Sequence, residues 1–161
     1  MDLTGRIIVG VDGSRASTLA AEWALALASR AGRTVDLVVA WQTRARMAVA
    51  PMAMGAPVDD GSLVLADEMR SDALSADAKA TAGRVGRVAQ ATQPDVPIRT
   101  WAIEGPAAEV LADLGGPGDL LVVGPAGHGP VAGAVLGSVA SRLIATARCP
   151  VVVVRDSADE G

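Results

Sequence analysis

Three glycines and a serine at fixed spacing form the part of the sequence best suited to bind a ligand. Gly124 and Gly127 are followed, after nine further residues, by Gly137 and Ser138. Glycine lets the backbone take positive φ angles and approach a ligand closely. A helix that starts at Gly137 and Ser138 would point unpaired N–H groups and the positive end of its dipole at a bound anion. The spacing therefore favours a phosphate site built from backbone rather than from a basic patch.

A second candidate segment, Val11-Asp12-Gly13-Ser14, follows the first predicted strand. Asp12 could approach a bound ligand, or it could cap the helix that comes next. The P-loop pattern GxxxxGK[ST] is absent, the only lysine, Lys79, lies far from any glycine-rich loop, and GxGxxG does not follow the first strand. Neither a P-loop NTPase nor a Rossmann dinucleotide site is supported.

Short apolar runs alternate with helical patterns along the chain, and these elements must position the two segments. Strands are predicted at 6–11, 35–41, 98–103, 120–123 and 151–154, and helices at 17–31, 62–92, 138–148 and from Pro106. Continuous apolar strands are typical of parallel sheets buried on both faces. The sequence predicts an α/β fold, an open five-stranded parallel sheet doubly wound with helices on both faces. Such sheets bind ligands at the carboxyl ends of their strands, where both candidate segments lie.

Composition narrows the class of protein. The length predicts a single domain over 1–155 with a flexible polar tail at 156–161. Fourteen basic against eighteen acidic residues, without a basic run, argue against nucleic acid or an anionic membrane as partner. No apolar run approaches the ~20 residues of a membrane helix, and no signal peptide is recognised. A lone cysteine, Cys149, fits a reducing compartment, so we expect a cytoplasmic protein.

The large side chains have different expected roles. Trp23 and Trp101 are expected in the core, whereas Trp41 at a strand end could be core or could stack on a flat ligand. Residues 42–61, with three methionines, two prolines and two glycines, are expected to form a mobile loop. His128, the only histidine, has no companion ligand for a metal and is expected to face solvent.

Four sequence blocks resemble the universal stress protein family in its ATP-binding type. They are VGVDGS, EGPAAEVLADL, LLVVGPAGHGPVAGAVLGSVASRLI and CPVVVVR. The nucleotide motif of that family, G-x2-G-x9-G-[ST], fits residues 124–138 without a gap. The resemblance implies an adenine nucleotide alpha hydrolase-like fold with strand order 3-2-1-4-5.

The resemblance also implies an ATP site at matching positions. The adenine pocket would be lined by Gly10, Val11, Trp41 and Val123, and the ribose and phosphates would be contacted by Gly124, Gly127, Gly137, Ser138 and Val139. Asp12 would lie near the sugar and phosphates, where Mg²⁺ bound with ATP could reach it. Two departures bear on affinity: Ala140 stands where the family commonly has Ser or Thr, and Pro125 removes one N–H from the loop. Ser141 could substitute for the missing hydroxyl only if the helix started elsewhere.

The function expected from this reading is an ATP-binding regulatory module in stress response, with an unknown protein partner and at most slow ATP hydrolysis. Strand 151–154 is expected at a sheet edge, where it would pair two subunits into a homodimer. No catalytic residue is assigned. Two alternatives stay open: a slow ATPase or nucleotidyl-transfer enzyme, and an interaction module of the same fold that binds no nucleotide.

Overall fold

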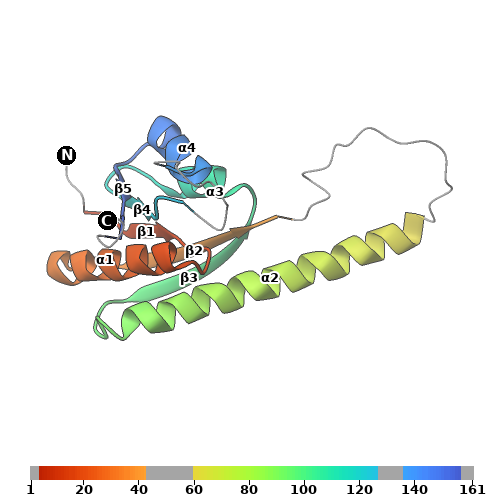
Figure 1. Ribbon diagram of the computed structural model, residues 1–161, viewed down its shortest axis with the longest axis horizontal. Coiled ribbons are helices and arrows are strands. Elements are labelled where there is room, and N and C mark those ends of the chain that lie inside the picture. Colours follow the sequence, from red (N-terminus) through yellow and green to blue (C-terminus); the bar gives the residue numbers. More distant parts are fainter. Residues whose placement is uncertain (1–3, 43–59, 127–135, 157–161) are drawn as a thin grey trace.

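Five strands and four helices alternate along the chain in the computed structural model (Figure 1). The structure describes residues 4–42, 60–126 and 136–156, with 60–67 described by their backbone alone. The strands are β1 (Ile7–Gly10), β2 (Val35–Trp41), β3 (Ile98–Glu104), β4 (Leu120–Val123) and β5 (Val151–Val153). The helices are α1 (Arg15–Ala31), α2 (Asp60–Gln90), α3 (Ala107–Leu114) and α4 (Ser138–Thr146).

The strands form one parallel sheet in the order β3-β2-β1-β4-β5. From β1 the chain moves to one side through β2 and β3, and then returns to place β4 and β5 on the other side. The strand order therefore reverses between β1 and β4, and the loops that leave these two strands diverge at the carboxyl edge of the sheet. Both the predicted α/β class and the predicted strand order are confirmed.

Helices cover both faces of the sheet (Figure 1). Along β1, Ile7 and Val9 pack into the core under α1 and α2, whereas Ile8 packs into the core under α3 and α4. All three side chains are fully buried. Alternate residues of a strand point to opposite faces, so a continuous apolar run supplies two cores at once.

The helix boundaries follow local capping. Ser14 caps α1, because its Oγ accepts a hydrogen bond from the N–H of Ser17 at 3.1 Å. The alternative in which Asp12 caps this helix is therefore wrong, and α1 starts two residues earlier than predicted. Gly32 ends α1 at a φ of 63°, as expected. Helix α2 begins at Asp60, two residues before the predicted start, so Ser62 lies inside the helix and does not cap it.

Two tryptophans expected in the core are partly exposed. Trp23 on α1 is 40% exposed, and Trp101 on the edge strand β3 is 43% exposed. An outer helix face and a sheet edge leave large rings half covered, which residue type alone cannot reveal. Residues 43–59, most of the predicted loop, lie outside the described part of the chain.

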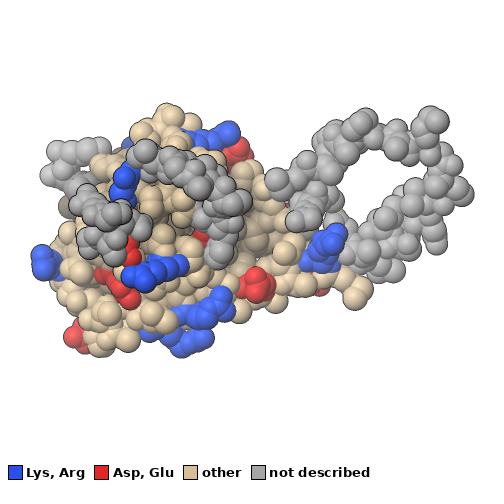
Figure 2. Space-filling view, in the orientation of Figure 1, with Lys and Arg blue, Asp and Glu red and all other residues tan. Residues whose placement is uncertain are grey.

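Charge is distributed without a dominant patch on the face shown in Figure 2, where basic and acidic side chains are interspersed. Within the described residues, no helix is long and apolar enough to cross a membrane. Asp156, the first residue of the predicted tail, forms an ion pair of 2.9 Å with Arg15 at the start of α1.

Candidate functional site

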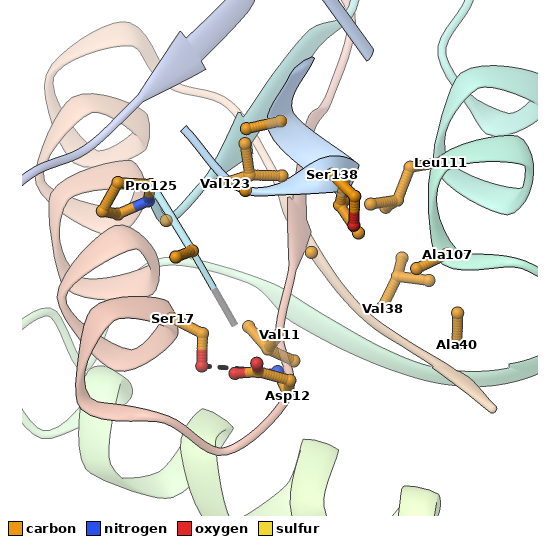
Figure 3. A pocket seen from close by; sticks show the side chains of 16 residues that line it. Val11, Asp12, Ser17, Val38, Ala40, Ala107, Leu111, Val123, Pro125 and Ser138 are labelled. Atoms are coloured by element: carbon orange, nitrogen blue, oxygen red, sulfur yellow. Dashed lines mark hydrogen bonds between the residues drawn. The ribbon is translucent and has the colours of Figure 1, made fainter. Parts of the chain in front are cut away.

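A cavity of about 310 Å³ lies at the carboxyl edge of the sheet, where the strand order reverses. Its walls come from the ends of β1, β2 and β4 and from the first turns of α1, α3 and α4 (Figure 3). Its size falls at the lower end of the ~300–1,000 Å³ range of small-molecule sites. The site therefore lies where a doubly wound fold is expected to bind its ligand.

One part of the cavity is apolar. Val38 and Ala40 of β2 and Ala107 and Leu111 of α3 supply its apolar side chains (Figure 3). Gly10 lets α3 pack close to the end of β1, because a Cβ added there would lie 2.7 Å from Leu111 Cδ1. The result is an apolar wall against which a flat ring could lie.

Another wall of the cavity is formed by backbone at the start of α4. Gly137 is the N-cap of α4 and makes no side-chain capping bond. Its N–H donates to the carbonyl oxygen of Pro125 at 2.6 Å, which ties the helix start to the segment leaving β4. Ser138 and Val139, in the first turn, line the cavity. The first N–H groups of a helix have no partner within it and carry partial positive charge, so this wall suits an anion.

The turn after β1 forms the third wall. The N–H of Asp12 donates to Ser17 Oγ at 3.3 Å, and the Asp12 carboxylate accepts from the N–H of Ser14 at 3.0 Å. Ser17 Oγ in turn donates to the carbonyl oxygen of Ser14 at 3.0 Å. These bonds hold one carboxylate at the cavity wall on a turn of fixed shape (Figure 3).

Most of the predicted site residues come together in this cavity. The predicted residues that line it are Gly10, Val11, Asp12, Val123, Gly124, Gly137, Ser138 and Val139. Gly127 and His128 lie outside the described residues, so the contact predicted for Gly127 stays a prediction.

Trp41 is not among the described residues that line the cavity. Strand β2 contributes Val38 and Ala40, and the next residue, Trp41, packs on the other side of the sheet against the core under α1 and α2. Its indole Nε1 is buried without an acceptor in the described part of the chain. The structure thus places Ala40, rather than the predicted Trp41, at the cavity wall.

Several lining residues were missed by sequence reasoning. Ser17 is 4% exposed and hydrogen-bonded at the cavity wall, and Ala107 and Leu111 bring α3 to the site. The signal for Ser17 was its place three residues after the helix cap Ser14. Ala107 and Leu111 were interpreted only as the apolar stripe of a helix.

The structure shows where Ala140, one of the two departures from the family motif, and its possible substitute Ser141 lie. Ala140 lines the cavity although it is 2% exposed and packs in the α3–α4 core, and its methyl side chain supplies no hydroxyl. Ser141 does not line the described cavity, since α4 starts at Ser138. Among the described residues of this wall, an anion would therefore meet backbone N–H groups and the Ser138 hydroxyl.

The described part of the chain has no group of three His, Cys, Asp or Glu side chains placed to hold a metal ion. Asp12 alone places a carboxylate at the cavity wall among the described lining residues. A single carboxylate fits a Mg²⁺ ion that is held mainly by the phosphates of a nucleotide and by water.

Comparison with known proteins gives the family. The sequence model described as the universal stress protein family matches residues 4–155. The universal stress protein Rv2624c of Mycobacterium tuberculosis is 30% identical over 154 residues, which cover 96% of this chain and 49% of the relative. The chain thus spans about half the length of the curated relatives it matches.

Solved structures agree with this assignment. The universal stress protein UspA from Lactobacillus plantarum aligns with a TM-score of 0.70 and 26% identity, covering 94% of this chain and 98% of that one. A universal stress protein in complex with cAMP aligns with a TM-score of 0.64 and 22% identity over 95% of this chain and 98% of that one, and it shares the fold. The sequence match over nearly the whole chain and the shared fold lead to one conclusion: this chain belongs to the universal stress protein family.

Proposed function

We propose that the protein binds ATP in this cavity and acts as a nucleotide-responsive binding module in stress response. The observation that carries the proposal is one continuous cavity with an apolar wall from β2 and α3 and with the open start of α4 at another wall. A purine ring fits the first wall, and phosphates fit the second. The complex of another universal stress protein with cAMP supports an adenine nucleotide as the ligand class.

At the described cavity walls, the phosphates would be held by backbone rather than by side-chain cations. No lysine or arginine is among the described residues that line the cavity. The N–H of Gly137 is already bonded to Pro125, so the phosphate contacts pass to the N–H groups of Ser138 and Val139 and to the Ser138 hydroxyl. Asp12 would meet Mg²⁺ bound to the phosphates.

A regulatory role is favoured over fast catalysis. Rapid phosphoryl transfer needs a charge clamp on the transferred group and a group that positions the nucleophile. The described lining residues offer one carboxylate, Asp12, and no cation. We therefore infer that ATP hydrolysis is slow and that an unidentified protein partner recognises the nucleotide-bound state of the protein. Cys149 as the only cysteine fits work in the reducing cytoplasm.

Nucleotide binding is tested first on the wild-type protein. Mass spectrometry of small molecules released from protein purified without added ATP should reveal an adenine nucleotide. ATP should also raise the melting temperature, since a ligand that binds only the folded state stabilises it. Protein that carries no nucleotide and does not respond to ATP would instead support the nucleotide-free interaction module.

The location of the site is tested with Ser138→Glu. An acidic residue in the first turn stabilises a helix, so the variant should fold, while its carboxylate repels phosphates at the α4 wall. Titration calorimetry should show ATP affinity lost in Ser138→Glu and kept in the control Lys79→Ala, which changes an exposed residue of α2. ATP affinity that is kept in Ser138→Glu and lost in Lys79→Ala would show that the phosphates bind elsewhere.

We further propose that β5 pairs with its counterpart in a second copy of the chain. β5 forms one edge of the sheet, and Val151, Val152 and Val153 are all partly exposed. A sheet edge of valines is a surface that proteins normally pair or cover. Twofold pairing of this strand would give an isologous homodimer.

A further inference from the structure

Helix α2 contacts the Asp12-Gly13 turn that forms one wall of the cavity. A Cβ added at Gly13 would lie 3.1 Å from Thr81 Cγ2 and 3.5 Å from Arg84 Nη2. Gly13 also has a φ of 83°, which side-chain-bearing residues rarely adopt. Glycine at this position therefore lets the guanidinium of Arg84 approach the turn that carries Asp12, although the two elements are far apart in the sequence.

The guanidinium of Arg84 is held beside this turn. Its Nη2 donates to Thr81 Oγ1 at 3.1 Å, and Thr81 is itself 6% exposed and fixed against the turn. The rest of the Arg84 side chain is exposed to solvent. No ion pair of Arg84 is found among the described residues, whereas Arg15, near the same edge of the sheet, pairs with Asp156. Arg84 thus brings a positive charge next to the turn that carries Asp12, although it is not itself among the described residues that line the cavity.

The positive charge of Arg84 would stabilise a polyanion bound in the site. Asp12 lines the cavity, and where no Mg²⁺ lies between them its carboxylate would repel the phosphates of a nucleotide. A guanidinium on the other side of Gly13 offsets that repulsion and attracts the same phosphates. Arginine keeps its charge at every physiological pH, so the compensation is permanent.

We propose that Arg84 is a nucleotide-binding residue that makes the site prefer adenine nucleotides with more phosphates. This proposal rests on the proposed function. The juxtaposition of Arg84, Gly13 and Asp12 carries this inference. Its effect should grow with the charge of the ligand, from none for adenosine through AMP and ADP to a maximum for ATP. The residue acts by charge beside the turn that carries Asp12, while the backbone of α4 fixes the geometry.

The test compares four ligands, adenosine, AMP, ADP and ATP, by titration calorimetry at low salt. Arg84→Gln removes the charge and keeps an amide able to donate to Thr81, whereas Arg84→Lys keeps the charge. Arg87→Ala is the matched control, because Arg87 is exposed one turn further along the same helix and its loss also removes one positive charge. Melting curves of all variants verify that the fold is kept.

We expect Arg84→Gln to weaken ATP binding about three- to tenfold, the effect of one charge partly screened by water, and to leave adenosine unchanged. Arg84→Lys should recover most of the loss, and Arg87→Ala should bind ATP like the wild type. Equal losses for adenosine and ATP, or equal ATP affinities of Arg84→Gln and Arg87→Ala, would overturn this inference alone. If the wild type bound none of the four ligands, both the proposed function and the inference about Arg84 would fail.

Discussion

The N–H of Gly137 donates to the carbonyl oxygen of Pro125 across 2.6 Å. This bond joins the two sides of the loop between β4 and α4, whose middle residues, 127–135, lie outside the described chain. Proline has no N–H to give to a phosphate, but its carbonyl oxygen and its restricted φ help to fix the start of α4. Pro125 therefore takes one donor from the site and orients the donors that follow Gly137.

Gly124→Val should weaken nucleotide binding. A Cβ at Gly124 would lie 3.1 Å from Ala16 Cβ and 3.2 Å from the Ala16 carbonyl carbon, which belong to the first turn of α1. Since backbone cannot yield as a flexible side chain can, the β4–α4 segment must move away from α1. We expect at least a tenfold loss of ATP affinity by calorimetry and a cost of about 1–3 kcal/mol in unfolding free energy.

The control for this variant is Gly116→Ala. A Cβ there meets only Asp119 Oδ2, at 3.6 Å, an ordinary contact far from the cavity walls. Gly116→Ala should bind ATP like the wild type. Wild-type affinity in Gly124→Val would show that the segment after β4 does not contact the nucleotide.

The fold could be predicted because its signals are local. The strands other than β3 are short, mainly apolar runs with breakers on both sides, and Gly32 and Ser138 mark helix ends at the predicted residues. The face that each strand residue occupies could not be predicted in the same way. In β2, residues 35–41 are apolar except Asp36, so the sequence does not reveal that Ala40 lines the cavity and Trp41 lies on the opposite face.

Contacts between elements that are distant along the chain also could not be predicted from the sequence. The glycine motif predicted the wall formed by α4 because its residues are close along the chain. Arg84 meets Gly13 only after α2 has packed beside α1, so no spacing rule links the two residues. For the same reason Asp36, a single acidic residue in an apolar strand, gave no hint of its two arginine partners.

ATP hydrolysis should be slow. Only Asp12 among the described lining residues has a carboxylate that could accept a proton from an attacking water molecule, and no described lining residue is a cation. We expect a few turnovers per hour or fewer, far below the ~1–10³ s⁻¹ of ordinary enzymes. Phosphate release from purified protein measures the rate, with Ser138→Glu as the control for contaminating ATPase. If the rate lay in the ordinary enzyme range and were lost in Ser138→Glu, the protein would be an ATPase rather than a regulatory module.

Asp36→Ala should destabilise the fold without touching the site. The Asp36 carboxylate is 1% exposed and accepts from Arg6 Nη1 at 2.6 Å and from Arg99 Nε at 2.8 Å. Its removal leaves a small void and two arginines that water can partly solvate, since their side chains are 30% and 55% exposed. We expect a loss of about 2–3 kcal/mol in urea unfolding.

Arg99→Ala provides the comparison for Asp36→Ala. Arg99 is the more exposed partner, and its removal leaves Asp36 paired with Arg6, so the cost should be about 1 kcal/mol or less. A larger loss in Arg99→Ala than in Asp36→Ala would show that the carboxylate is not the centre of this cluster.

Cys149 should react slowly with thiol reagents in the folded protein. Burial, and then the nearby carboxylate of Asp119, raise the pKa of the Cys149 thiol above its usual value. At about pH 7.5 the group is therefore a thiol rather than the reactive thiolate, and reagents also have poor access to it. Labelling should be much slower than in the same protein unfolded in urea, and should accelerate as pH rises. Equal rates in the folded and unfolded protein would contradict the buried position.

Assembly through β5 is tested at Val152 and Val153. The two side chains point to opposite faces of the sheet, toward the α1–α2 core and the α3–α4 core respectively, and both stay partly exposed. An arginine at either position would bring two like charges close together across a twofold axis, so Val152→Arg or Val153→Arg should give a monomer by light scattering. The opposite edge strand provides the control: Thr100→Arg on β3 changes an exposed position and should stay dimeric. Wild-type protein that is monomeric at ~10 µM, above a micromolar dissociation constant, would refute the β5 dimer.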